Sequence, residues 1–146
     1  MQPRMNVLTL AVEDIQRSLE FYRALGFESP GIGGTEFVGD ESAPGGAVAM
    51  FEFDGGLILA LYSRADLAKD AGISLAPPSS GQFSIGQLAG SREQVDSILA
   101  EAESAGARVT DAPHERPWGI YSGYFRDLDG YLWEIIWNPD RAASDA

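Results

Sequence analysis

The sequence contains no cysteine and a single histidine, His114. The absence of cysteine excludes disulfide bonds, thiol nucleophiles and zinc sites built on thiolates. Long apolar runs are also missing. The run at residues 7–12 ends at two acidic residues and is far shorter than a membrane span or a signal-peptide core. We therefore expect a cytoplasmic protein that does not associate with membranes.

Basic residues are scarce. The chain has 10 Lys and Arg against 22 Asp and Glu, which gives a formal net charge of -12. Such a surface repels phosphate backbones and anionic lipid head groups, so we expect no nucleic-acid partner. No phosphate-binding loop and no nucleophile elbow occurs in the sequence. An acidic chain of this kind instead attracts cations over long range.

The chain is long enough to bury a core, with 146 residues of which 45% are hydrophobic. It repeats one pattern about 75 residues apart: residues 53–61 (FDGGLILAL) and residues 128–136 (LDGYLWEII). Each copy is an Asp-Gly turn that runs into an apolar strand. Two copies at this distance indicate a fused duplicate rather than a solenoid repeat.

Each half of the chain is predicted to fold in the same order of elements. Asp14 and Ser91 are typical helix N-caps, and apolar residues follow both at helical spacing until Gly26 and Gly106. One helical turn is predicted at 66–71, turns or loops at 30–34, 40–46 and 112–119, and a linker at 77–81. The predicted strands are 6–12, 27–28, 47–53 and 57–62 in the first half, and 83–89, 108–110, 121–126 and 132–137 in the second.

This order, together with residues 10–27 (LAVEDIQRSLEFYRALGF) and 123–134 (GYFRDLDGYLWE), resembles the vicinal oxygen chelate superfamily. That superfamily includes glyoxalase I, extradiol dioxygenases and bleomycin-resistance proteins. The resemblance implies an α+β fold of two tandem βαβββ modules that form a curved eight-stranded sheet around a shared cavity. We expect one domain over 1–146, with module one at 5–62, a linker at 63–82 and module two at 83–139. The resemblance also implies a homodimer.

The resemblance implies where a metal would be bound, with one ligand from the first strand and one from the last strand of each module. Only Glu134 among these positions is a strong ligand, whereas divalent transition metals favour two or three His or carboxylate ligands. We therefore expect no metal-dependent glyoxalase or dioxygenase activity and no cofactor. A divalent metal held by Glu134 and water stays an open alternative. Allowing for a shift of one residue, the positions are Asn6, Val7 or Leu8; Leu59 or Ala60; Ser84; and Glu134.

Glu134 is also the candidate catalytic residue, since a carboxylate in an apolar cavity suits a general base. Its alternative role is a structural carboxylate bonded to neighbouring strands. The other candidates are aromatic or polar residues that would line the cavity and contact a ligand. For the aromatic ones the alternative is core packing, and strand parity leaves the facing of Gln87 and Ser84 open. The candidate ligand-binding residues are Trp118, Tyr121, Tyr124, Gln87, Phe51 and Ser84.

Three functions are compatible with these residues. The first is a metal-free binding protein for an apolar or aromatic small molecule, similar to bleomycin-resistance proteins. The second is a lyase, isomerase or dioxygenase-type enzyme that uses Glu134 as base or as its sole strong metal ligand. The third is a non-catalytic oligomeric interaction module. The sequence favours the first, because the predicted metal positions have lost their ligands.

Overall fold

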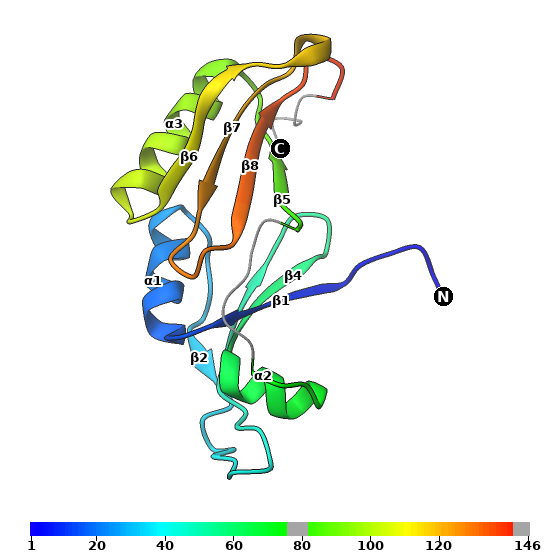
Figure 1. Cartoon of the computed structure of the whole chain (residues 1–146), viewed down its shortest axis with the longest axis vertical. Helices are drawn as coiled ribbons and strands as arrows, with labels where there is room; N and C mark the ends of the chain where they lie inside the picture. Colours follow the sequence, from blue (N-terminus) through cyan, green and yellow to red (C-terminus); the bar gives the residue numbers. More distant parts are fainter. Residues whose placement is uncertain (76–81, 142–146) are drawn as a thin grey trace. The chain divides into compact units, whose positions relative to one another are not determined.

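The computed structural model describes residues 1–75 and 82–141. The chain forms two compact units, Met1–Pro77 and Pro78–Ala146. The predicted linker at 77–81 lies outside the described residues. Each unit carries a βαβββ order of elements and its own four-stranded mixed sheet (Figure 1). The predicted α+β fold of two βαβββ modules is thereby confirmed, and its eight strands are distributed over two sheets.

The first unit places its strands in the order β1-β4-β3-β2. The first and last strands of the unit in sequence, β1 and β4, run parallel to each other, and the remaining strand pairs are antiparallel. A short helix, α2, follows β4 directly and is two turns long, where the sequence predicted one. The elements are β1 (Val7–Val12), α1 (Ile15–Ala24), β2 (Ile32–Gly33), β3 (Val48–Glu52), β4 (Ile58–Ser63) and α2 (Arg64–Ala71).

Helix α1 supplies the aromatic core of the first unit. The Asp14 side chain accepts a hydrogen bond from the backbone N–H of Arg17 at 3.2 Å and so caps the helix. Gly26 ends it with a φ of 99°, a conformation that glycine adopts without strain. Tyr22 is buried under the sheet, and its ring lies 5.9 Å from the ring of Phe51 on β3. The helix therefore covers the face of the sheet on which Phe51 lies.

The second unit repeats the arrangement, with strand order β5-β8-β7-β6 and a parallel pair formed by β5 and β8. Helix α3 contacts β6, β7 and β8 and covers one face of this sheet (Figure 1). The other face carries no helix of this unit. The elements are β5 (Ile85–Leu88), α3 (Arg92–Ser104), β6 (Arg108–Glu115), the 3-10 turn η1 (Pro117–Gly119), β7 (Tyr121–Arg126) and β8 (Leu132–Trp137).

Helix α3 begins at the predicted cap. The Ser91 hydroxyl accepts from the backbone N–H of Gln94 at 3.0 Å, and the Gln94 side chain accepts from the N–H of Gly90. Its buried residues face Trp133 and Ile135 of β8, which are 3% and 1% exposed. Trp133 therefore packs under α3. Alternation along the strand then places Glu134 on the opposite face.

Three predicted boundaries were wrong. The sequence predicted a strand at 27–28, but the strand of this region is β2 at Ile32–Gly33, where a turn was expected. Residues 112–115, predicted as loop, belong to β6, which runs to Glu115. Pairing with β7 extends β6, and two register shifts between Val109 and His114 accommodate a proline in this edge strand. Such pairing joins distant segments and overrides local turn signals.

Candidate functional site

The helix-free face of the second sheet holds Glu134. In the pairing of the strands, Glu134 lies beside Tyr124 on β7 and Gly86 on β5. Cross-strand partners share a face, so Tyr124 and Glu134 point to the same side. Residues two positions apart also share a face, and this parity brings Ser84 and Leu88 to the side of Glu134. We name this surface, with Glu134 and Tyr124 at its centre, the Glu134 face.

The internal repeat can be aligned by backbone hydrogen bonds. In the first turn the N–H of Phe53 donates to the carbonyl of Leu57 at 2.8 Å, and in the second the N–H of Asp127 donates to that of Tyr131 at 2.9 Å. These equivalent bonds align each residue of the first unit with the residue 74 positions later in the second unit. The counterpart of Glu134 in the first unit is therefore Ala60. Leu59, the alternative from the sequence, pairs with Phe51 and so lies on the face that α1 covers.

The positions that the resemblance implies for a metal are thus Val7 and Ala60 in the first unit, and Ser84 and Glu134 in the second. Two of these side chains are hydrocarbons, one is a hydroxyl and one is a carboxylate. A divalent transition metal is held in proteins by several His, Cys or carboxylate ligands. Over the described residues, no group of three or more His, Asp or Glu side chains is arranged to hold a metal ion. The residues present do not fit a resident divalent metal.

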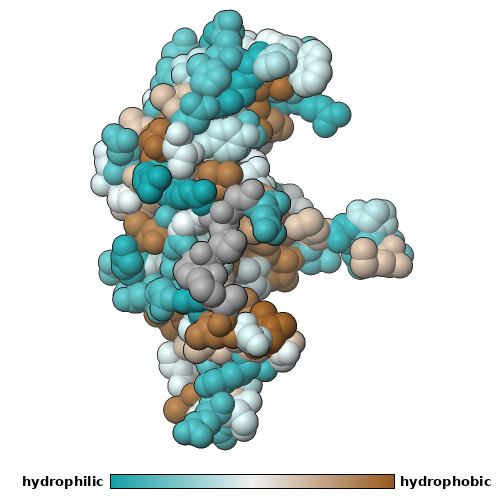
Figure 2. Space-filling model, in the orientation of Figure 1, coloured by the Kyte–Doolittle hydropathy of each residue, from teal (hydrophilic) through white to brown (hydrophobic). Residues whose placement is uncertain are grey.

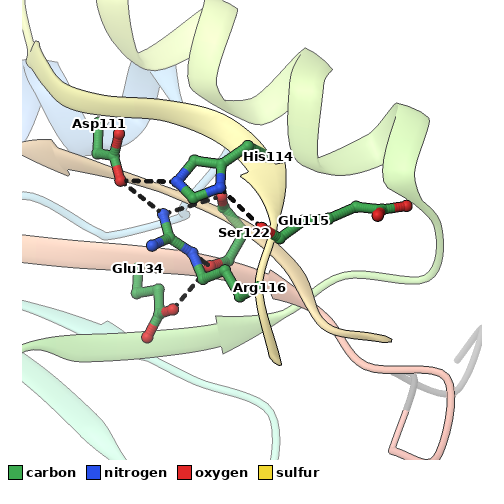
Figure 3. Close-up of polar contacts among 6 residues, drawn as sticks. All are labelled: Asp111, His114, Glu115, Arg116, Ser122 and Glu134. Carbon is green, nitrogen blue, oxygen red and sulfur yellow. Dashed lines mark hydrogen bonds and ion pairs between the residues drawn. The ribbon is translucent and has the colours of Figure 1, made fainter. Parts of the chain in front are cut away.

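Glu134 instead belongs to a chain of protein hydrogen bonds that spans three strands (Figure 3). Its Oε2 accepts from the Ser122 hydroxyl at 2.8 Å. The Ser122 Oγ accepts in turn from Nε of Arg116 at 2.5 Å, and Nη2 of Arg116 donates to the Ser122 carbonyl at 3.2 Å. The same Nη2 donates to Oδ2 of Asp111 at 2.9 Å. Two carboxylates are therefore linked through one guanidinium and one hydroxyl.

The chain of bonds has a fixed direction. An arginine N–H only donates, so Ser122 must be the acceptor of Arg116 and its own proton is left for Glu134. Ser122 is 0% exposed, so a substrate cannot reach its oxygen, and its proton is already donated. Ser122 orients Glu134 and is not placed to act as a nucleophile.

Asp111 and His114 lie at the exposed end of this network, and each side chain is about half exposed. The hydrogen bond from Arg116 and then that from His114 lower the pKa of Asp111. His114 places Nε2 3.0 Å from Oδ2 of Asp111 and Nδ1 2.8 Å from the Glu115 carbonyl. Both ring nitrogens of His114 therefore lie within hydrogen-bond distance of an oxygen atom. Arg116 and His114 thus both hold the Asp111 carboxylate in place.

Tyr124 contacts both Arg116 and Glu134. The guanidinium of Arg116 lies 5.1 Å from the centre of its ring, within range of a cation–π contact. Burial, followed by the nearby Glu134 carboxylate as hydrogen-bond acceptor and negative charge, raises the pKa of the Tyr124 phenol. The phenol therefore remains a neutral donor beside Glu134 at physiological pH.

Tyr121 lies on the other face of the sheet. Its hydroxyl donates to Oδ1 of Asp96 on α3 at 2.6 Å, and Arg92 of the same helix lies 5.1 Å from its ring centre. The hydrogen bond to Asp96, then burial, raises the pKa of this phenol. These contacts join β7 to α3. Tyr121 does not share the face of Glu134, so the structure separates two tyrosines that the sequence grouped together.

The remaining predicted ligand-binding residues are dispersed. Phe51 is 0% exposed and belongs to the aromatic core of the first unit. Gln87 is exposed on β5, in register with the buried Ile135 and hence away from the Glu134 face. Trp118 is 88% exposed at η1. Only Tyr124 and Ser84 share the face of Glu134 within the second unit.

Sequence reasoning missed Arg116 and Ser122. Ser122 was within reach, because it lies two residues before Tyr124 and so has the same parity. Arg116 was not, since the residues before it were assigned to a loop and the register shifts in β6 hide its partner strand. No local sequence pattern pairs residue 116 with residue 122 across a hairpin tip.

A family model for the Glyoxalase/Bleomycin resistance protein/Dioxygenase superfamily matches residues 4–135. The chain belongs to this superfamily. The match spans both βαβββ units and both turns of the repeat. The superfamily predicted by resemblance is thereby confirmed, and within it this member keeps a carboxylate at one of four metal positions.

Solved structures of the glyoxalase fold are similar over nearly the whole chain. A glyoxalase-related enzyme from Fulvimarina pelagi has 22% identity and a TM-score of 0.77, covering 94% of this chain and 90% of that one. A hypothetical protein from S. aureus has 24% identity and a TM-score of 0.74, covering 93% and 94%. A lactoylglutathione lyase from Agrobacterium tumefaciens has 23% identity and a TM-score of 0.63, covering 94% and 95%. At these identities the likeness establishes the fold.

None of the curated proteins compared with the chain matches it. Among the described residues, no helix of this glyoxalase-superfamily member is long and apolar enough to span a bilayer. The Glu134 face is therefore the feature that bears on the ligand and the activity.

Proposed function

We propose that this glyoxalase-superfamily member is a metal-free binding protein for an apolar or aromatic small molecule, with the Glu134 face as part of its site. The observation that carries the proposal is the set of four metal positions, which holds a single carboxylate. That carboxylate is bonded to Ser122 rather than arranged with further ligands. The other three positions offer no strong ligand, whereas a transition metal is held by several.

The apolar part of the proposed contact comes from the residues around Glu134. Leu88 is 42% exposed and pairs with Ile136 in the sheet, and Leu132 pairs with Arg126. Burying apolar surface of such side chains against a ligand contributes roughly 25 cal/mol per Å². Tyr124 adds an aromatic ring with a polar tip. This combination favours a ligand that is mainly apolar and carries a polar group at one end.

Elemental analysis and ligand-induced thermal stabilisation test this proposal. The purified protein should contain no stoichiometric transition metal, and zinc, iron or manganese should leave the melting temperature unchanged. Planar aromatic compounds should raise it, since a ligand at about 100 times its Kd stabilises by roughly 2.7 kcal/mol. Glu134→Gln should reduce the stabilisation, while Glu103→Gln, on the exposed side of α3, should not. Tight metal with activity lost on chelation would overturn the proposal.

A proton-transfer enzyme with Glu134 as general base is the second candidate. The observation in its favour is Arg116, a cation that shares the Ser122 hydroxyl with Glu134. Abstraction of a proton next to a carbonyl needs a base and a positive group for the developing oxyanion. The test is exchange of carbon-bound protons of hydroxyketones in D2O, followed by proton NMR. Exchange that Glu134→Gln abolishes would establish this function in place of the first.

A further inference from the structure

The direction of the hydrogen bonds restricts what Glu134 can receive. Arg116 donates to Ser122, and Ser122 donates to Oε2 of Glu134. The polarity of this chain cannot reverse, because a guanidinium has no acceptor atom. Ser122 therefore stabilises Glu134 as an acceptor. A carboxylate has about four acceptor positions, so a ligand group that joins Ser122 and Tyr124 at Glu134 must also be a hydrogen-bond donor, and a carbonyl or carboxylate there would meet repulsion.

Glu134 has no direct ionic partner among the described residues, because the Ser122 hydroxyl lies between it and Arg116. Across the described residues, Glu134 forms no ion pair with any Arg, Lys or His. Its partners Ser122 and Tyr124 are neutral hydroxyls. The nearest cation of the network, Arg116, forms its ion pair with Asp111 at 2.9 Å. A half-buried carboxylate with neutral donors alone retains its attraction for a cation.

From these two observations we infer that the ligand carries a protonated amine, with the ammonium bound to Glu134 and an apolar or aromatic body on Leu88, Ile136 and Leu132. This inference rests on the proposed binding function and names the chemical class of its ligand. An ammonium supplies both the donor and the positive charge that Glu134 lacks, and charge-assisted bonds are the stronger kind. The net charge of -12 adds long-range attraction for the same class.

The experiment compares two probes of nearly equal shape, naphthylmethylamine and naphthylmethanol, by isothermal titration calorimetry at physiological ionic strength. The wild-type protein should bind the amine at least about tenfold more tightly than the alcohol. In Glu134→Gln, which keeps the shape of the side chain, the two affinities should become equal. Ser122→Ala should lower the preference for the amine in part, because it removes the donor that orients Glu134.

Two controls separate local charge from the general acidity of the chain. Glu103→Gln removes one negative charge on α3 and should keep the full preference for the amine. If Glu134→Gln does not fold, a salt series on the wild type replaces it. Binding of the amine should then weaken with salt and that of the alcohol should not, though a half-buried pair is screened less than a surface one.

The outcomes distinguish the inference from the function on which it rests. Equal wild-type binding of the two probes overturns the amine class and leaves the binding function standing. A preference that survives Glu134→Gln likewise overturns the role of Glu134. Binding of neither probe overturns the inference and counts against the proposed function as well.

Discussion

Trp118 carries the clearest conformational strain of any single residue described in the structure. Its φ is 64° and its side chain is 88% exposed. The left-handed region costs a non-glycine residue about 1–2 kcal/mol, and an exposed indole recovers little of this by packing. A strained, exposed tryptophan at a hairpin tip is consistent with the predicted ligand contact, which remains a prediction.

Replacement of Trp118 by glycine separates strain from packing. Trp118→Gly should leave the free energy of unfolding unchanged or raise it by about 0.5 kcal/mol, because relief of strain exceeds the entropic cost of glycine. Trp118→Ala keeps the left-handed backbone and should not stabilise. Urea denaturation measures both. A loss of more than about 1 kcal/mol in Trp118→Gly would mean that the indole packs against the protein.

Ser122 is the residue on which the polar network depends. Ser122→Ala should lower the free energy of unfolding by about 1–3 kcal/mol, because it leaves Arg116 Nε and Glu134 Oε2 without their partner. Ser97→Ala, on the exposed side of α3, should change it by less than about 0.5 kcal/mol. Denaturation by urea at neutral pH checks both variants. Equal effects would contradict the network as a source of stability.

At the scale of elements, Arg92 holds α3 against the sheet. A cation in the first turn of a helix is unfavourable for the helix dipole, so its position needs another cause. The guanidinium lies 5.1 Å from the ring centre of Tyr121 and 5.2 Å from that of Trp137, and 2.8 Å from Oε1 of Glu115. These contacts join the start of the helix to β7, β8 and the end of β6.

Substitutions at Arg92 test this contact. Arg92→Ala should lower the free energy of unfolding by about 1 kcal/mol, mostly through the two cation–π contacts, since the exposed ion pair with Glu115 adds little. Arg92→Lys keeps the charge but loses the planar stacking group, and should recover only part of the loss. The measurement is thermal or urea unfolding. Full recovery by lysine would show that charge alone is responsible.

Asp66 connects α2 to the loop that precedes β3. It accepts from the N–H of Gly45 at 2.9 Å and from the Ser63 hydroxyl at 2.8 Å. The bond from Gly45, followed by that from Ser63, lowers the pKa of Asp66 below 3.8. A carboxyl with a depressed folded pKa stabilises the fold above its unfolded pKa, and this contribution disappears as the pH falls through the folded value.

The lowered pKa of Asp66 determines how the stability of Asp66→Asn should vary with pH. The variant should be less stable than the wild type at neutral pH, and the difference should shrink as the pH falls below 3.8. Free energies of unfolding at several pH values decide the matter. A difference that stays constant with pH would contradict the role of the ionised carboxyl.

At the scale of the whole molecule, hydrophilic residues cover much of the face seen in Figure 2, and hydrophobic areas interrupt them. Large apolar side chains stand in solvent in both units. Scattered exposure of this kind is normal, but contiguous apolar surface marks contact sites. The exposed residues on or beside the sheets are Val7, Met50, Phe83 and Leu88.

A homodimer is the prediction that belongs to this scale. Sedimentation at several protein concentrations should give twice the chain mass of 15.7 kDa, because association would cover exposed apolar surface. The dimer should persist at high salt, which screens charge but not apolar burial. A single-chain mass at every concentration would contradict it. A dimer that shows no ligand-induced stabilisation would favour the third function, an interaction module.

The sequence by itself determined the order of elements, the helix caps, the duplicated turns and the superfamily. These depend on local spacing and on which residues can cap, turn or alternate. It also determined that three of four metal positions lack a strong ligand, because side-chain chemistry does not depend on the fold. Even the ambiguity between Leu59 and Ala60 left that conclusion unchanged.

Only the tertiary structure decided which side chains meet. Arg116 reaches Ser122, and Ser122 reaches Glu134, because β6 extends past its expected end and pairs with β7 through two register shifts. The same pairing sends Tyr124 to the Glu134 face and Tyr121 to α3. A shift of one residue moves a side chain to the opposite face of a sheet, and strand register is set by contacts between distant segments rather than by local sequence.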